Sequence, residues 1–153
     1  MLGESQFGIV MVPTISLAES QGEAFEKIKV SSTFLNGPAA QKKLQLFFSP
    51  EYSKALQPKI FIMTPETLFG TASTQGLLDQ LKNLGEQIRF IAIDEVHLVL
   101  ECWANFRNSF NEVQHLKSIF QCPILALTAI LKPESVHSHT FWVYLAFISL
   151  LST

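Results

Sequence analysis

The chain has 153 residues, of which 48% are hydrophobic and 16% charged, so it is long enough for one globular domain with a sizeable core, and its composition excludes a disordered or fibrous protein. The formal net charge of −2 provides no overall positive charge for holding nucleic acid, so such binding must be argued from motifs. Cys102 and Cys122 lack metal-ligand spacing and a secreted disulfide pattern, and we expect ordinary buried thiols in a reducing compartment.

Short apolar runs predict the strands of one sheet. Each run is bounded by turn or capping residues, which is typical of buried strands that alternate with helices. The predicted strands cover residues 7–12, 30–35, 59–63, 88–93 and 122–127. This alternation predicts an α/β fold with a mostly parallel sheet flanked by helices.

Capping residues and leucine spacing predict the helices. Ser16 is expected to cap a helix that runs to about Lys29, and Thr64 to cap another with Pro65 in its first turn. Leucines at helical spacing, after a polar loop, predict a further helix that faces the core. The remaining predicted helical segments are residues 38–48, the leucine-spaced segment 77–84, and 105–120.

The strand over residues 88–93 stops at two adjacent carboxylates, Asp94 and Glu95. Unpaired carboxylates are costly to bury, so we expect them at the carboxyl edge of the sheet, where ligands bind in open α/β folds. Nucleotide hydrolysis needs one carboxylate for a hydrated Mg²⁺ and a second for the attacking water. Asp94 fits the metal role and Glu95 the water role. The alternative, a solvated pair at a strand end, would be the better explanation of a bare dipeptide.

The tetrad Asp94-Glu95-Val96-His97 resembles motif II, the Walker B box of superfamily 2 helicases, in a variant of the Asp-Glu-Ala-His form. Other segments resemble motifs of RecQ-like helicases. Residues 12–21 resemble motif Ia, 64–66 read Thr-Pro-Glu as in motif Ib, and 126–129 read Ala-Leu-Thr-Ala as in motif III. Separated motifs in the right order are hard to obtain by chance, and the resemblance runs from about residue 9 to residue 136.

Residues 98–110 resemble the aromatic-rich loop that follows motif II in RecQ-like helicases. Phe106 and Arg107 match this loop, and Trp103 stands one place late. Aromatic rings stack on unpaired bases and arginine binds phosphate, so the loop can couple single-strand binding to the carboxylates. In the alternative, Trp103, Phe106 and Phe110 form one apolar helix face; we prefer this for Phe110.

The resemblance implies a RecA-like lobe, of the P-loop NTPase type, from a helicase that uses ATP and Mg²⁺ to unwind DNA from 3′ to 5′ in repair or recombination. It assigns Asp94 to Mg²⁺ through water, Glu95 to water activation, and His97 and Thr128 to coupling. Helix N-termini can also meet DNA phosphates through free amides. The DNA-binding residues that it implies are Ser16, Thr64, Trp103, Phe106 and Arg107. Single-stranded or forked DNA is the expected partner, and the nucleus the expected location.

The sequence contains no Gly-x-x-x-x-Gly-Lys-Ser/Thr, the loop that cradles phosphates. We therefore expect residues 1–136 to be a partial ATP-binding domain, incomplete at its N-terminus and without the second motor lobe, with little or no ATPase activity alone. Residues 137–153 are expected to be an apolar tail of doubtful origin; its run 141–151 is too short to span a bilayer, and no membrane partner is expected. The rival hypothesis is a non-catalytic helicase remnant that binds nucleic acid or a partner protein.

Overall fold

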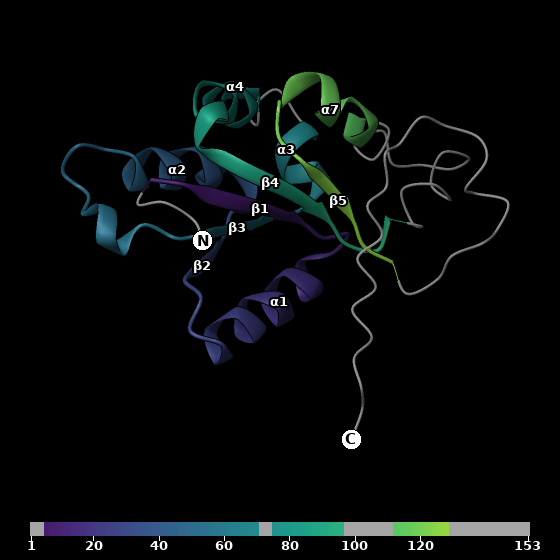
Figure 1. Ribbon diagram of the computed structural model, residues 1–153, viewed down its shortest axis with the longest axis horizontal. Helices are drawn as coiled ribbons and strands as arrows, with labels where there is room; N and C mark the ends of the chain where they lie inside the picture. Colours follow the sequence, from purple (N-terminus) through teal and green to yellow (C-terminus); the bar gives the residue numbers. More distant parts are fainter. Residues whose placement is uncertain (1–4, 71–74, 97–111, 129–153) are drawn as a thin grey trace, which may run out of the picture.

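The computed structural model describes residues 5–70, 75–96 and 112–128. In this part of the chain five strands form one sheet with the order β2-β3-β1-β4-β5, and each neighbouring pair runs parallel (Figure 1). The strands are β1 (Phe7–Met11), β2 (Ser32–Phe34), β3 (Ile60–Met63), β4 (Ile88–Ile93) and β5 (Ile124–Ala126). Because all five run the same way, their carboxyl ends meet at one edge. The predicted α/β fold with a parallel sheet is confirmed.

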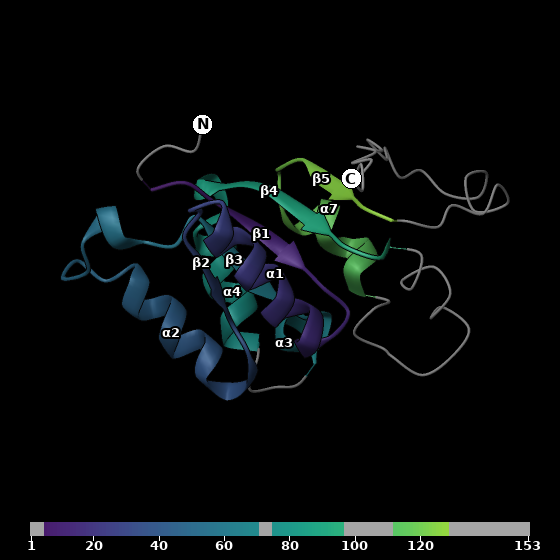
Figure 2. The same cartoon turned by 90° about the horizontal axis from the view of Figure 1, so that it is seen from below.

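Helices cover both faces of this sheet, but unequally. Helix α1 lies on one face, and the other described helices lie on the opposite face (Figures 1 and 2). The helices are α1 (Ile15–Lys27), α2 (Ala40–Phe47), α3 (Pro65–Phe69), α4 (Gln75–Asn83) and α7 (Leu116–Ile119). Short 3₁₀ turns join them: η1 (Gly37–Ala39), η2 (Lys54–Leu56), η3 (Gly85–Gln87) and η5 (Val113–His115). No described helix is long and apolar enough to cross a membrane.

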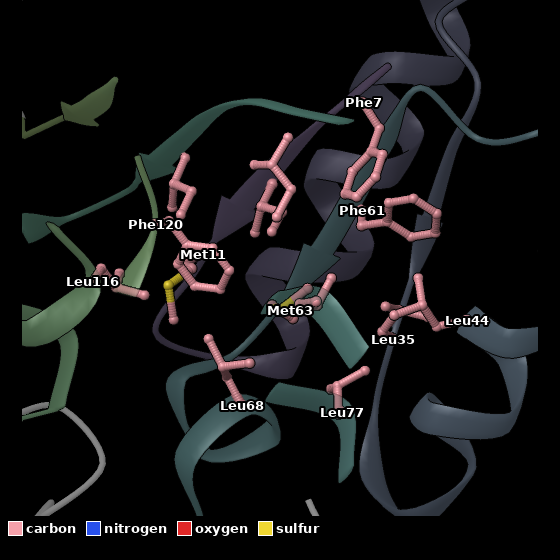
Figure 3. Packing of buried hydrophobic residues seen from close by; sticks show 14 of the residues in the cluster. Phe7, Met11, Leu35, Leu44, Phe61, Met63, Leu68, Leu77, Leu116 and Phe120 are labelled. Carbon is pink, nitrogen blue, oxygen red and sulfur yellow. The ribbon is translucent and has the colours of Figure 1, made fainter. Parts of the chain in front are cut away.

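The larger hydrophobic core lies between the sheet and the layer of four helices (Figure 3). Every residue of β1 and of β3 is buried, as expected for strands covered on both faces. From α4, Leu77 and Leu81 are buried in this core, which confirms the helix predicted from leucine spacing. Cys122 is also buried, as predicted; burial raises the pKa of its thiol, and the charge of Lys117 lowers it in part.

A smaller core lies between the sheet and α1. It contains Val10 of β1, Val12 directly after that strand, Ala18 from α1, and residues of β3 and β4. Strand β1 contributes residues to both cores, because successive side chains of a strand point to opposite faces of the sheet. Phe7, Ile9 and Met11 therefore belong to the larger core.

Helix α1 is capped by Thr14, so the predicted cap at Ser16 is wrong. The backbone of Thr14 is extended, with φ −141° and ψ 155°, and its hydroxyl accepts a hydrogen bond from the Leu17 amide at 3.2 Å. Ser16 lies exposed in the first turn of the helix. Both residues are suitable caps by type, but a helix that starts after Thr14 buries Ala18 completely against the sheet. Tertiary burial therefore decides between the two hydroxyls.

Replacing Thr14 with alanine is expected to lower the free energy of unfolding by about 1 kcal/mol, because one amide of the first turn loses its partner. Ser16→Ala is the matched control, and it should change the stability by less than about 0.5 kcal/mol. Urea unfolding followed by circular dichroism measures both. An equal loss in the two variants would contradict the assignment of the cap.

Other boundaries also differ from the prediction. Helix α1 ends at Lys27, and the chain then passes through Lys29 in the left-handed region at φ 58°. Because the Val30 amide still donates to the Phe25 carbonyl at 2.9 Å, β2 begins only at Ser32.

The helix predicted over residues 105–120 is corrected in its described part, where η5 precedes the four-residue α7 and Phe120 is already extended. Val113, Leu116 and Phe120 are buried at spacings of three and four residues, a pattern that a 3₁₀ turn followed by an α-helical turn satisfies as well as one continuous helix. Residues 105–111 lie outside the described part.

Candidate nucleotide and metal site

The turn after β4 is held by backbone hydrogen bonds to residues at the carboxyl ends of β1 and β5, the two strands beside β4. The Asp94 amide donates to the Met11 carbonyl of β1 at 2.8 Å. On the other side, the Leu127 amide donates to the Ile93 carbonyl at 2.8 Å, and the Val96 amide donates to the Leu127 carbonyl at 2.9 Å. The predicted position of the two carboxylates, at the carboxyl edge of the sheet, is therefore observed.

Asp94 is half-buried, and both of its carboxylate oxygens have donors within hydrogen-bond reach. Oδ1 accepts from the Glu95 amide at 2.9 Å. Oδ2 accepts from Nε2 of Gln21, a residue of α1, at 3.4 Å. These neutral donors restrict the rotation of the carboxylate without neutralising its charge. The negative charge therefore remains available to a cation.

Glu95 takes a backbone conformation that is rare for residues other than glycine. Its φ is 51°, in the left-handed region, which costs about 1–3 kcal/mol for such a residue. The hydrogen bonds of Asp94 to β1 and of Val96 to Leu127 hold the chain on both sides of it. Its side chain is half-buried, and the Oε2 atom is fully shielded from solvent. The surrounding strands thus impose the turn that contains Asp94 and Glu95 of motif II.

Thr128 lies beside this turn, because it directly follows Leu127, whose backbone bonds to residues on both sides of the carboxylate pair. It is half-buried, two residues beyond the end of β5. Thr128, Asp94 and Glu95 are therefore brought to one edge of the sheet, although 33 positions separate Thr128 from Glu95 in the sequence.

Ser16 and Thr64 also follow strands that end at this edge, but their environments differ. Ser16 is exposed in the first turn of α1. Thr64 is only 5% exposed, and its hydroxyl accepts from the Thr67 amide at 3.3 Å as the cap of α3, which confirms the predicted helix start. The hydroxyl of Thr64 is thus engaged within the protein. Four further predicted site residues lie outside the described part: His97, Trp103, Phe106 and Arg107.

Gln21 lies near the carboxylates, and no role was predicted for it from the sequence. It ends the segment that resembles motif Ia, and it stands three residues after Ala18, on the stripe of α1 that faces the sheet. A polar side chain on the buried stripe of an amphipathic helix was the available signal. Its partner could not be read from the sequence, because Asp94 is 73 positions away.

The donor set near Asp94 fits a hydrated magnesium ion better than a fully coordinated one. Among the residues that the structure describes, no group of three or more His, Cys, Asp and Glu side chains is placed to hold a metal. Mg²⁺ keeps several of its waters and is commonly bound through one or two carboxylates and substrate phosphates. A single oriented carboxylate at an open sheet edge agrees with that chemistry.

Residues 2–138 match the family model described as DEAD/DEAH box helicase. The chain belongs to this family. The motif II, Ia and III segments all fall within the matched residues, so the resemblance seen in the sequence is confirmed for most of the chain.

Among curated proteins, this helicase chain is similar to RecQ-type enzymes. It is 30% identical over 124 residues to "Putative ATP-dependent DNA helicase Q1" of Caenorhabditis briggsae, covering 79% of this chain and 20% of that protein. It is 29% identical over 128 residues to "ATP-dependent DNA helicase RecQ" of Bacillus subtilis, covering 82% and 20%. It is 30% identical over 130 residues to "RecQ-like DNA helicase BLM" of Xenopus laevis, covering 82% and 9%. The chain thus spans a fifth or less of these relatives.

A solved structure supports the fold. The chain is similar to the DUF1998 helicase MrfA, crystallised with DNA, with a TM-score of 0.56 and 21% identity over 87% of this chain and 19% of that one. At this identity the likeness concerns the fold alone, and it agrees with the predicted RecA-like helicase lobe.

Proposed function

We propose that this chain is part of an ATP-dependent 3′-5′ DNA helicase of the RecQ type, with residues 1–136 forming a partial ATP-binding lobe. The observation that carries the proposal is the motif II turn, which backbone hydrogen bonds fix between the ends of β1 and β5. That turn places Asp94 and Glu95 where ligands bind in parallel sheets. The RecQ-type relatives are named as ATP-dependent DNA helicases.

In this proposal Asp94 would hold Mg²⁺ through water, and Glu95 would orient and deprotonate the attacking water. The ion supplies charge stabilisation for phosphoryl transfer when it is bound. The two donors to Asp94 keep its carboxylate in one orientation. Orientation matters because catalysis of phosphoryl transfer depends mainly on positioning and electrostatics.

Coupling between hydrolysis and DNA would pass through the segment that contains Thr128. The Leu127 backbone bonds to Ile93 and Val96 on either side of the carboxylates. A shift of this segment therefore changes the turn directly. His97, which follows that turn in the sequence, would act with Thr128.

DNA would meet the same sheet edge. Ser16 is exposed at the start of α1, where free amides of the first turn suit a phosphate. The loop residues Trp103, Phe106 and Arg107 would stack on bases and bind phosphate. Thr64, which follows β3 on the other side of β1 from β4, would also meet the DNA. The fold is shared with a helicase crystallised with DNA. We propose single-stranded or forked DNA as the partner and, by analogy with the RecQ-like family, a nuclear location.

The second candidate is a non-catalytic remnant that binds nucleic acid or a partner protein. The observation that favours it is the lack of a phosphate-cradling Gly-x-x-x-x-Gly-Lys-Ser/Thr loop among the 153 residues. Residues 137–153 add no motif to either candidate.

DNA-stimulated ATP hydrolysis by residues 1–153, beside Glu95→Gln, is the first measurement. We expect no turnover above background from either protein, because the triphosphate has no cradle. Turnover that Glu95→Gln removes would contradict this expectation and demonstrate a working motif II.

A longer product of the same gene that carries a phosphate loop separates the two candidates. Under the helicase proposal it hydrolyses ATP, and Glu95→Gln lowers its rate by about 10²- to 10⁴-fold, the usual contribution of a general base. A phosphate-loop product that hydrolyses no ATP with DNA present would overturn the proposal in favour of the remnant.

A further inference from the structure

Gln21 joins helix α1 to the carboxylate that ends β4. Its Nε2 donates to Asp94 Oδ2 across 73 positions of sequence, in a partly buried environment. The other oxygen, Oδ1, is already engaged by the Glu95 amide at 2.9 Å. The Gln21 amide is thus the donor to Oδ2, and together with the Glu95 amide it sets the orientation of the carboxylate.

The helix holds this amide in a defined place. Ala18, one turn earlier on the same face, is fully buried against the sheet. Thr14 caps the helix at the sheet edge. Gln21 therefore projects from a helix that is anchored at both of these points. The packing of this helix sets the 3.4 Å distance between Nε2 of Gln21 and Oδ2 of Asp94.

The chemical type of the residue matters as much as its position. A lysine or arginine here would pair with Asp94 and compete with a cation for the same charge. A neutral amide can donate a hydrogen bond and leave the charge in place. This combination suits a carboxylate that must be oriented and still attract a divalent ion.

We propose that Gln21 is a positioning residue, which orients the Asp94 carboxylate for a hydrated divalent cation and links α1 to that site. The inference rests on the proposed metal role of Asp94. It goes beyond that role because it assigns a function to a residue of α1 outside motif II.

The test uses Mn²⁺ alone as the probe, titrated into residues 1–153 while the free ion is followed by electron paramagnetic resonance. Asp94→Asn should remove the site. Gln21→Met, which has similar length and no donor, should weaken Mn²⁺ binding by about 2- to 12-fold, the range for one hydrogen bond. Gln21→Glu should tighten binding, because it places a second carboxylate beside the first. A residue with only a packing role would not produce opposite changes.

Glu23→Met is the matched control, since Glu23 is an exposed residue of the same helix and its substitution should leave Mn²⁺ binding unchanged. If Asp94→Asn removes the site while both Gln21 variants bind as the wild type does, the inference is overturned. If Asp94→Asn leaves binding unchanged, the metal role in the proposed function fails instead.

In that second case, and independently of any metal, thermal unfolding decides whether Gln21 positions Asp94. Gln21→Met, Asp94→Ala and the double variant form a cycle. Melting temperatures that are non-additive by about 2–4 °C would uphold the positioning contact. Additive changes would overturn it.

Discussion

Replacing Phe61 with alanine is expected to lower the free energy of unfolding by about 3–5 kcal/mol. Phe61 lies in β3, between β2 and β1, and none of its surface is exposed. Its ring meets Phe7 edge-on with the centroids 5.0 Å apart (Figure 3). Its centroid lies 5.9 Å from that of Phe47 and 6.1 Å from that of Phe48. Removing the ring leaves a cavity at the centre of this cluster, and the aromatic contacts are lost with it.

Urea unfolding of the wild type, Phe61→Ala and two comparison variants measures this effect. Phe61→Leu retains most of the volume and should cost less than about half as much as the alanine variant. Phe25→Ala, on the α1 face where Phe25 is only partly buried, should also cost less. A loss below about 1 kcal/mol in Phe61→Ala would show that the aromatic cluster does not dominate the core.

Gly8→Ala is expected to destabilise the fold by about 1–3 kcal/mol, the usual cost of overpacking. Gly8 in β1 pairs with Phe90 in β4. A Cβ atom at position 8 would lie 2.3 Å from Cζ of the Phe90 ring, with the two Cε atoms at 2.6 and 2.8 Å. The ring covers the glycine, so any side chain there must displace it.

The same unfolding measurement with Phe90→Ala tests the cause. In the Phe90→Ala background, adding Gly8→Ala should cost much less than it does in the wild type, because the obstructing ring is gone. Gly85→Ala is the matched control, since a Cβ at Gly85 meets nothing within 4 Å. An unchanged cost of Gly8→Ala in the two backgrounds would place the strain elsewhere.

Some features of the candidate site follow from the local sequence, and others depend on contacts between distant segments. The position of Asp94 and Glu95 at a strand end was predicted, because an apolar run followed by two carboxylates has few other stable arrangements. The left-handed backbone of Glu95 and the amide of Gln21 were not predicted. Both depend on which strands and helices become neighbours.

The sequence by itself determined the five strands, the cap at Thr64 and the motifs that connect the chain to the helicase family. Each of these is a local property: an apolar run indicates burial, and a hydroxyl before a helix indicates a cap. The tertiary structure alone decided the order β2-β3-β1-β4-β5, the cap at Thr14 in place of Ser16, and the contact of Gln21 with Asp94. The physical reason is that strand order and side-chain contacts depend on packing between segments distant in sequence, whose mutual burial no local pattern records.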